Sequence, residues 1–192
     1  MIRERLSDDI LNRIINYVNT NQTLVFMIGV PASGKSYISN IIASKASNCV
    51  RVNMDDIMEE LYGTADVEDW REVNKLNKTL GYSSNIIKNT ARDKAKDALK
   101  RGQSVVYDAT NLRTDARIKM LRSMQYMVNR KIKTMAIIVN ADIDTVKFRN
   151  SNRERTVQWF VIRKMYREAQ LPIETNNHEF DEVIVIDNSP VQ

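Results

Sequence analysis

Apolar residues follow two periods that alternate along the 192-residue chain. Short uncharged runs such as TLVFMI (23–28) and MAIIVN (135–140) have the length and the β-branched content of buried strands. Between such runs, apolar residues recur every three or four positions, which is the spacing of one helix face. This alternation predicts a doubly wound α/β fold, with a parallel sheet covered by helices on both faces.

The pattern places about five strands and a series of helices. The expected strands are 23–28, 48–53, 103–110, 132–140 and 181–188. Helices are expected within 1–20, from Lys35 onward, over 55–63, twice within 68–101 with a break near Gly81, and over 114–128, 142–152 and 156–170. In the first helix, Ser7 is the expected N-cap. No repeat, low-complexity segment or linker is evident, so we expect one domain over 1–192.

The net charge of +5 is unevenly distributed. Residues 54–69 contain seven acidic side chains and no basic one, whereas 86–133 contain thirteen Lys and Arg against four Asp. A basic face can attract a phosphate-rich partner such as nucleic acid. The alternative is that these charges are only the solvated sides of amphipathic helices, and charge alone leaves both interpretations open.

Composition argues against a membrane protein and against a zinc site. No apolar run reaches membrane-spanning length, and the first residues lack a signal-like apolar region. A single cysteine, Cys49, and a single histidine, His178, do not supply a zinc site. We therefore expect a cytoplasmic protein with no membrane partner.

The stretch GVPASGKS (29–36) lies between an expected strand and an expected helix, the context in which a phosphate-binding loop occurs. Gly29 and Gly34 permit backbone angles that let the amides of 31–36 surround a polyphosphate. Lys35 would reach the β- and γ-phosphates and Ser36 would bind Mg²⁺. The alternative is a degenerate loop kept as a tight turn. The residues expected to bind ATP or GTP are Gly29, Pro31, Ala32, Ser33, Gly34, Lys35, Ser36 and Tyr37.

Two acidic positions follow strands whose carboxyl ends should face this loop. Asp55 is the candidate general base that would accept a proton from an attacking hydroxyl; alternatively it caps the following helix. Its neighbour Asp56 is better suited to the cap or the first helical turn. Asp108 could hold a Mg²⁺-bound water or orient the loop, or it could be a turn cap. Asn111 and Thr110 are weaker candidates.

The segment RNSNRER supplies three arginines to a candidate lid over 148–157. Arg149 and Arg153 are four residues apart and would share a face if the segment is helical. Their guanidinium groups could clamp phosphates and stabilise charge in a transition state; the third arginine of the segment is Arg155. Without the phosphate-binding loop, the same run would be a solvated surface.

These motifs together resemble the kinase domain of bacteriophage-type polynucleotide 5′-kinases, a group related to zeta-toxin-like small P-loop kinases. The resemblance runs from about residue 23 to 172, with GVPASGKS, VNMDD, DATNL, and RNSNR followed by VIRKMY in order. It implies Mg·ATP-dependent phosphorylation of a 5′-hydroxyl on DNA or RNA. It also implies that Lys35 and Ser36 handle Mg·ATP, that Asp55 is the base and that Arg153 is the lid arginine, with Arg149 beside it.

Three departures from that family bear on the acceptor. The family has a phosphate-gripping arginine three residues after the base, where this chain has Met58. Arg51, Arg71 or Arg113 are possible substitutes. The lid is one residue shorter, and no fused phosphatase domain is expected. A hydroxymethylated base in DNA and a small nucleoside or sugar therefore stay open as acceptors, and a nucleotide-binding switch or hydrolase is a further alternative.

Overall fold

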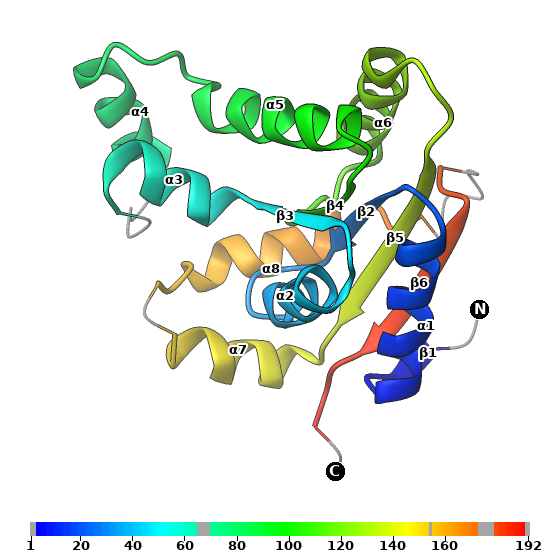
Figure 1. Ribbon diagram of the computed structural model, residues 1–192. Helices are drawn as coiled ribbons and strands as arrows, with labels where there is room; N and C mark the ends of the chain where they lie inside the picture. The colour runs from blue at the N-terminus through cyan, green and yellow to red at the C-terminus, as the bar shows by residue number, and fades with distance from the viewer. Residues whose placement is uncertain (1–2, 65–69, 154, 173–178, 191–192) are drawn as a thin grey trace.

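The computed structural model describes residues 3–64, 70–153, 155–172 and 179–190, and the predicted alternation of strands and helices is confirmed there (Figure 1). The elements are β1 (Arg3–Arg5), α1 (Asp8–Thr20), β2 (Thr23–Ile28), α2 (Lys35–Lys45), β3 (Cys49–Asn53), α3 (Met54–Tyr62), α4 (Trp70–Thr79), α5 (Ile86–Lys100), β4 (Ser104–Asp108), α6 (Thr114–Val128), β5 (Lys133–Asn140), α7 (Ile143–Ser151), α8 (Trp159–Glu168) and β6 (Glu182–Asp187).

The described strands form one parallel sheet in the order β1-β6-β5-β2-β4-β3. The sheet has six strands rather than the expected five, because Arg3–Arg5 pairs with β6. The predicted helix within 1–20 is therefore shorter and begins at Asp8, with Ser7 as its N-cap. A three-residue strand of charged residues carries no hydrophobic period, and charged side chains are common on edge strands.

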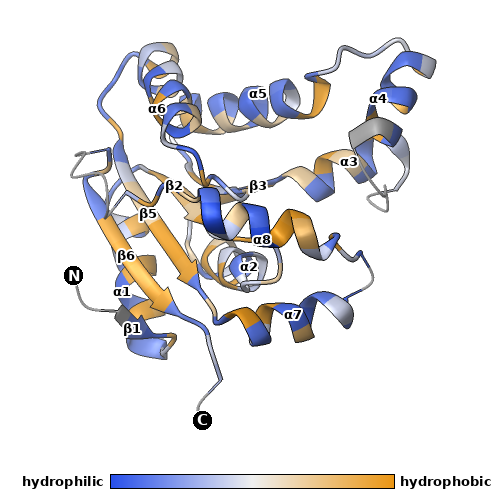
Figure 2. Ribbon diagram, turned by 180° about the vertical axis from the view of Figure 1, so that it is seen from behind, coloured by the Kyte–Doolittle hydropathy of each residue, from blue (hydrophilic) through white to orange (hydrophobic). Residues whose placement is uncertain are grey.

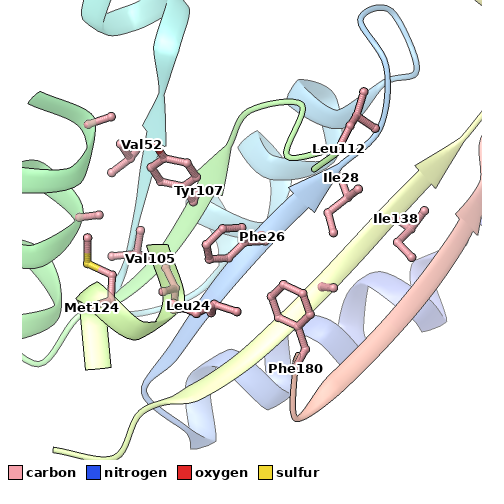
Figure 3. Close-up of a cluster of buried hydrophobic side chains, with 14 of the residues drawn as sticks. Leu24, Phe26, Ile28, Val52, Val105, Tyr107, Leu112, Met124, Ile138 and Phe180 are labelled. Carbon is pink, nitrogen blue, oxygen red and sulfur yellow. The ribbon is translucent and has the colours of Figure 1, made fainter. Parts of the chain in front are cut away.

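Successive residues of each strand face opposite layers, which creates two separate hydrophobic clusters. Val25 and Met27 of β2 pack with α1 and α2 on one face. Leu24, Phe26 and Ile28 pack with α3, α5, α6 and α8 on the other (Figure 3). Figure 2 shows β5 and β6 as strongly hydrophobic strands, as expected when both faces of a parallel sheet are covered.

The carboxyl ends of the parallel strands meet at one edge of the sheet, where the candidate residues gather. The loop after β2, the start of α3 and the loop after β4 all follow strand ends. α7 begins just beyond the carboxyl end of β5, and α8 follows it in the chain (Figure 1). Ligands of open α/β sheets bind at this edge. Among the described residues no helix is long and apolar enough to span a bilayer.

Candidate active site

The loop between β2 and α2 adopts backbone angles that side chains resist. Gly29 has φ 152°, Ala32 φ 63° and Gly34 φ 101°, and Gly34 is the N-cap of α2. A Cβ on Gly29 would lie 2.6 Å from the carbonyl oxygen of Val139. A Cβ on Gly34 would lie 2.1 Å from Asn188 Nδ2. Gly29 is therefore required by sterics as well as by φ, whereas Gly34 is required by φ, and a Cβ there would also displace the Asn188 side chain.

One hydroxyl in this loop lacks a partner among the described residues. Ser33 is fully buried, and its Oγ makes no hydrogen bond there. A buried hydroxyl without a partner is costly, and a phosphate oxygen would satisfy it. The loop also opens onto the N-terminus of the 11-residue helix α2, which favours an anion. The residues present thus fit a polyphosphate.

Lys35 is the buried cation of the loop. Its Nζ donates to the Val30 carbonyl oxygen at 2.6 Å. Burial lowers its pKa from 10.5 to about 8; Asp108 and Asp55 oppose this decrease, and Arg153 adds to it. A triphosphate would relieve the cost of burying this charge. Because their charges act on Lys35, Asp55 and Arg153 belong to the same electrostatic site as the loop.

The remaining predicted binding residues outside the glycines are more exposed than Ser33 and Lys35. Pro31 and Ala32 are half-buried, whereas Ser36 and Tyr37 are exposed in the first turn of α2. Tyr37 is 63% exposed. Ser36 is therefore open to a divalent ion carried by a nucleotide.

Asp55 lies in the first turn of α3 and is not its cap. The N-cap is Asn53, whose Oδ1 accepts hydrogen bonds from the amides of Asp55 at 2.7 Å and Asp56 at 3.1 Å. The capping alternative for Asp55 is therefore wrong, and Asp56 is a first-turn acid. An Asn two residues before a pair of acids is a signal for a cap that the sequence reasoning missed.

Asp108 is buried at the end of β4 and holds a polar network together. Its Oδ2 accepts from Ser39 Oγ at 2.8 Å, from Arg51 Nη2 at 2.8 Å and from Asn53 Nδ2 at 2.9 Å. Arg51 also donates to Asp56 at 2.6 Å. Asp108 thereby fixes the side chain that caps α3 and orients Asp55. Any contact with metal-bound water would have to use its other carboxylate oxygen.

The two arginines expected to share a helix face are separated in the structure. α7 ends at Ser151, so Arg149 lies within the helix and Arg153 beyond it. Arg149 donates to the carbonyl oxygens of Asn188 at 2.9 Å and Ser33 at 3.5 Å. Arg149 therefore contacts the loop's main chain, whereas Arg153 acts on Lys35 through its charge.

Asn188 is a residue at this site that the sequence reasoning missed. It follows β6, and its side-chain amide donates to the Ser33 carbonyl oxygen at 2.8 Å. Its own backbone amide donates to Asn140 at the end of β5. A residue this distant in sequence could be found only from the strand order, since β6 ends beside β5.

Met58 does not line the surface near the candidate base. It is 3% exposed and belongs to the hydrophobic cluster beneath α3. Of the suggested substitutes, Arg51 pairs with Asp108 and Asp56, and Arg113 pairs with Asp115. The side chain of Arg71 lies outside the described part of the chain. Arg155 instead donates to the Asp55 carboxylate.

A buried ion pair supports the loop after β4. Arg117 is 1% exposed; it forms two hydrogen bonds to Glu179 and donates to the Asn111 carbonyl oxygen at 2.9 Å. Asn111, with φ 47°, donates to the Met27 carbonyl oxygen at 2.8 Å. The sequence reasoning counted Arg117 among the charges of a basic region and gave it no role. Its burial could not be read from composition.

Comparison with known proteins identifies the group to which this chain belongs. The AAA domain family AAA_33 matches residues 24–172. The chain is a member of the AAA domain family. A comparison with curated protein sequences finds no significant match.

Solved structures share the fold at low sequence identity. A provisionally named kinase from Chloroflexus aurantiacus is 15% identical, with a TM-score of 0.59 and coverage of 88% of this chain and 89% of that one. A chain of the Pnkp1/Rnl/Hen1 RNA repair complex is 20% identical, with a TM-score of 0.55, and 77% of this chain matches 44% of that one. A gluconokinase from Sinorhizobium meliloti is 10% identical, with a TM-score of 0.52 and coverage of 88% and 85%. The AAA domain protein therefore has the fold of P-loop NTPases and kinases.

Proposed function

We propose that this AAA domain protein is a Mg·ATP-dependent kinase that transfers the γ-phosphate to an alcohol hydroxyl, with residues 1–192 acting as one kinase domain. The observation that carries the proposal is the set of groups at the carboxyl edge of the sheet: the buried Lys35 and the Ser33 Oγ, unpartnered among the described residues, in the loop, Asp55 in the first turn of α3, and α7, which contacts the loop through Arg149 and is followed by Arg153. A kinase needs such a set: a cation for the phosphates, a carboxylate for the acceptor proton and an arginine for the developing charge. Two of the structural neighbours are named as kinases.

Each residue of the candidate site would act on a particular group in the proposed reaction. The loop amides and Ser33 Oγ bind phosphate oxygens, and Lys35 neutralises the β- and γ-phosphates. The acceptor oxygen bonds to the γ-phosphorus, the bond from that phosphorus to the bridging oxygen breaks, and ADP leaves. Asp55 accepts the hydroxyl proton. Arg153 stabilises the equatorial oxygens, and Arg149 holds the loop's main chain.

Magnesium would be held chiefly by the nucleotide. Within the described ranges, no cluster of three or more His, Cys, Asp or Glu side chains could hold a metal ion. Mg²⁺ in phosphoryl-transfer sites typically keeps several waters and binds substrate phosphates with one or two protein oxygens. Ser36 would supply the protein oxygen, and the ion would neutralise charge on the phosphates.

For the acceptor, we propose a nucleic acid, and specifically a 5′-hydroxyl end of DNA or RNA. The sequence motifs resemble those of polynucleotide 5′-kinases, and one structural neighbour belongs to an RNA repair complex. The excess of basic residues over 86–133 would favour a polyanion.

A small nucleoside or sugar is the second candidate acceptor, with a hydroxymethylated DNA base as an intermediate case. The burial of Met58 favours a small acceptor. The position that carries a phosphate-gripping arginine in polynucleotide kinases faces the core here. One structural neighbour with this fold is named as a gluconokinase, which supports a sugar-like acceptor.

Phosphate transfer from γ-labelled ATP tests the proposal and separates the acceptors. The protein is incubated with Mg²⁺ and 5′-hydroxyl oligonucleotides, nucleosides, sugars or DNA with hydroxymethylated bases. Label on the oligonucleotide end supports the proposed acceptor, and label on a nucleoside or sugar supports the second. Release of free phosphate alone, with every acceptor, would favour a switch or hydrolase.

A further inference from the structure

Arg155 contacts the carboxylate that we propose as the general base. Its guanidinium donates to Asp55 Oδ1, although 100 residues separate the two in the sequence. The two side chains are 29% and 46% exposed, so water reaches both. The pair is therefore an open contact at the candidate site and not a buried structural bridge.

Arg155 and Arg153 have different partners despite their proximity in the chain. The charge of Arg153 acts on Lys35 of the phosphate-binding loop. Arg155 instead faces the start of α3, where Asn53 holds the backbone of Asp55 in place. The cap fixes the backbone of Asp55, and Arg155 occupies Oδ1, one of the two oxygens of the carboxylate that would accept a substrate proton.

A half-exposed base beside a triphosphate creates a risk of hydrolysis. A water oxygen could bond to the γ-phosphorus as the bond to the bridging oxygen breaks and ADP leaves. The water's proton would pass to Asp55 and then to solvent. This reaction consumes ATP without phosphorylating an acceptor, and kinases limit it by controlling access of water to the reacting groups.

The strength of the contact suits a discriminating role. An exposed ion pair changes an equilibrium by at most about fivefold, which is about 1 kcal/mol. An acceptor can displace it by using binding energy from contacts away from its hydroxyl. Water has no such remote contacts, so it has no additional binding energy with which to displace Arg155 from Asp55.

We propose that Arg155 is a specificity-determining residue that reserves Asp55 for the acceptor hydroxyl and suppresses phosphate transfer to water. This inference rests on the proposed function, because it takes Asp55 as the base of a kinase. It assigns Arg155 a role separate from that of Arg153, which acts on the phosphates.

ATP hydrolysis without any acceptor tests this role, using the full chain with Mg²⁺. Arg155→Met removes the charge but keeps a long side chain, and it should hydrolyse ATP about two- to fivefold faster than the wild type. Arg155→Lys keeps the charge and should stay nearer to the wild type. Arg167→Met is the matched control: Arg167 is 76% exposed on α8 and contacts its neighbour Glu168. Its hydrolysis rate should equal that of the wild type.

A second variant ties the effect to the base. Adding Asp55→Asn to Arg155→Met should abolish the increase, because no carboxylate remains to take the water's proton. The inference is overturned if Arg155→Met binds ATP normally but hydrolyses it no faster than the wild type. It is also overturned if neither Arg155→Met nor the wild type hydrolyses ATP. Failure of the proposed function looks different: the wild type would not bind ATP, or Asp55→Asn would transfer phosphate to an acceptor at the normal rate.

Discussion

The two halves of the candidate site are held together in different ways. On the nucleotide side, Lys35 and Ser33 are buried, Gly29 is crowded by the main chain of Val139 and Gly34 by the side chain of Asn188. On the acceptor side, Asp55 and Arg155 remain partly exposed and pair with each other across the two segments. In the proposed reaction, a preformed loop would bind the triphosphate, whereas acceptor choice would depend on side chains that can exchange partners.

Removal of the loop lysine should give the largest effect on the nucleotide side. We expect Lys35→Met to lower phosphate transfer by about 10³-fold, because the β- and γ-phosphates lose their buried cation. Lys45→Met removes an exposed lysine from the last turn of the same helix and is the control. Steady-state rates of label transfer measure both. Equal rates for the two variants would contradict the difference that we draw between buried and exposed residues of α2.

Truncation of Arg153 should affect the chemical step more than ATP binding. We expect Arg153→Ala to lower kcat by about 10²-fold, because an aligned donor to the transferring group is lost. The dissociation constant for ATP, measured by calorimetry, should change far less. If affinity falls as much as the rate does, Arg153 is an ordinary binding residue of the nucleotide side.

The depressed pKa of Lys35 predicts that ATP affinity depends on pH. In the free protein its pKa is about 8, so the side chain is mostly protonated at pH 7 and mostly neutral at pH 9. A bound triphosphate favours the protonated form, so affinity should fall by about tenfold across this range as pH rises. Titrations at several pH values measure this. The dependence should vanish in Lys35→Met, and its persistence there would assign it to another group.

Arg51 should affect stability more than rate. Arg51→Met leaves the buried Asp108 without its cation and should lower the free energy of unfolding by about 3 kcal/mol. Urea unfolding gives this value, and Arg13→Met, which breaks an exposed pair with Glu4, is the control. Transfer by the folded fraction should fall less than in Arg153→Ala, because Arg51 contacts Asp56, Asp108 and Ser39 and acts on Asp55 only indirectly. If Arg51→Met lowers the free energy of unfolding no more than Arg13→Met does, the network around Asp108 contributes little to stability.

The sequence predicted the parts of this fold that depend on local pattern. The strands and the loop glycines follow from hydrophobic period and from backbone sterics, and the structure has both. The N-cap of α1 at Ser7 was predicted correctly. The strand Arg3–Arg5 was missed, because this charged segment is defined only by its pairing with β6.

The site was predictable only where a residue's role depends on its immediate neighbours. Asn188 contacts the loop because β6 lies beside β5 in the sheet. Arg117 is buried against Glu179, which is 62 residues away in the sequence. The end of α7 before Arg153 separates two arginines that a continued helix would have aligned. Such contacts depend on tertiary structure, which helical spacing and composition do not encode.

Asp55→Asn tests the central claim most directly, when phosphate transfer and ATP binding are measured on the same preparation. We predict that phosphate transfer to the acceptor substrate falls by about 10²- to 10⁴-fold, because no carboxylate remains to take the hydroxyl proton. ATP affinity should stay within about twofold, because the loop is intact. Asp56→Asn, which alters the neighbouring acid paired with Arg51, should keep most of the activity. Normal transfer by Asp55→Asn would contradict the account.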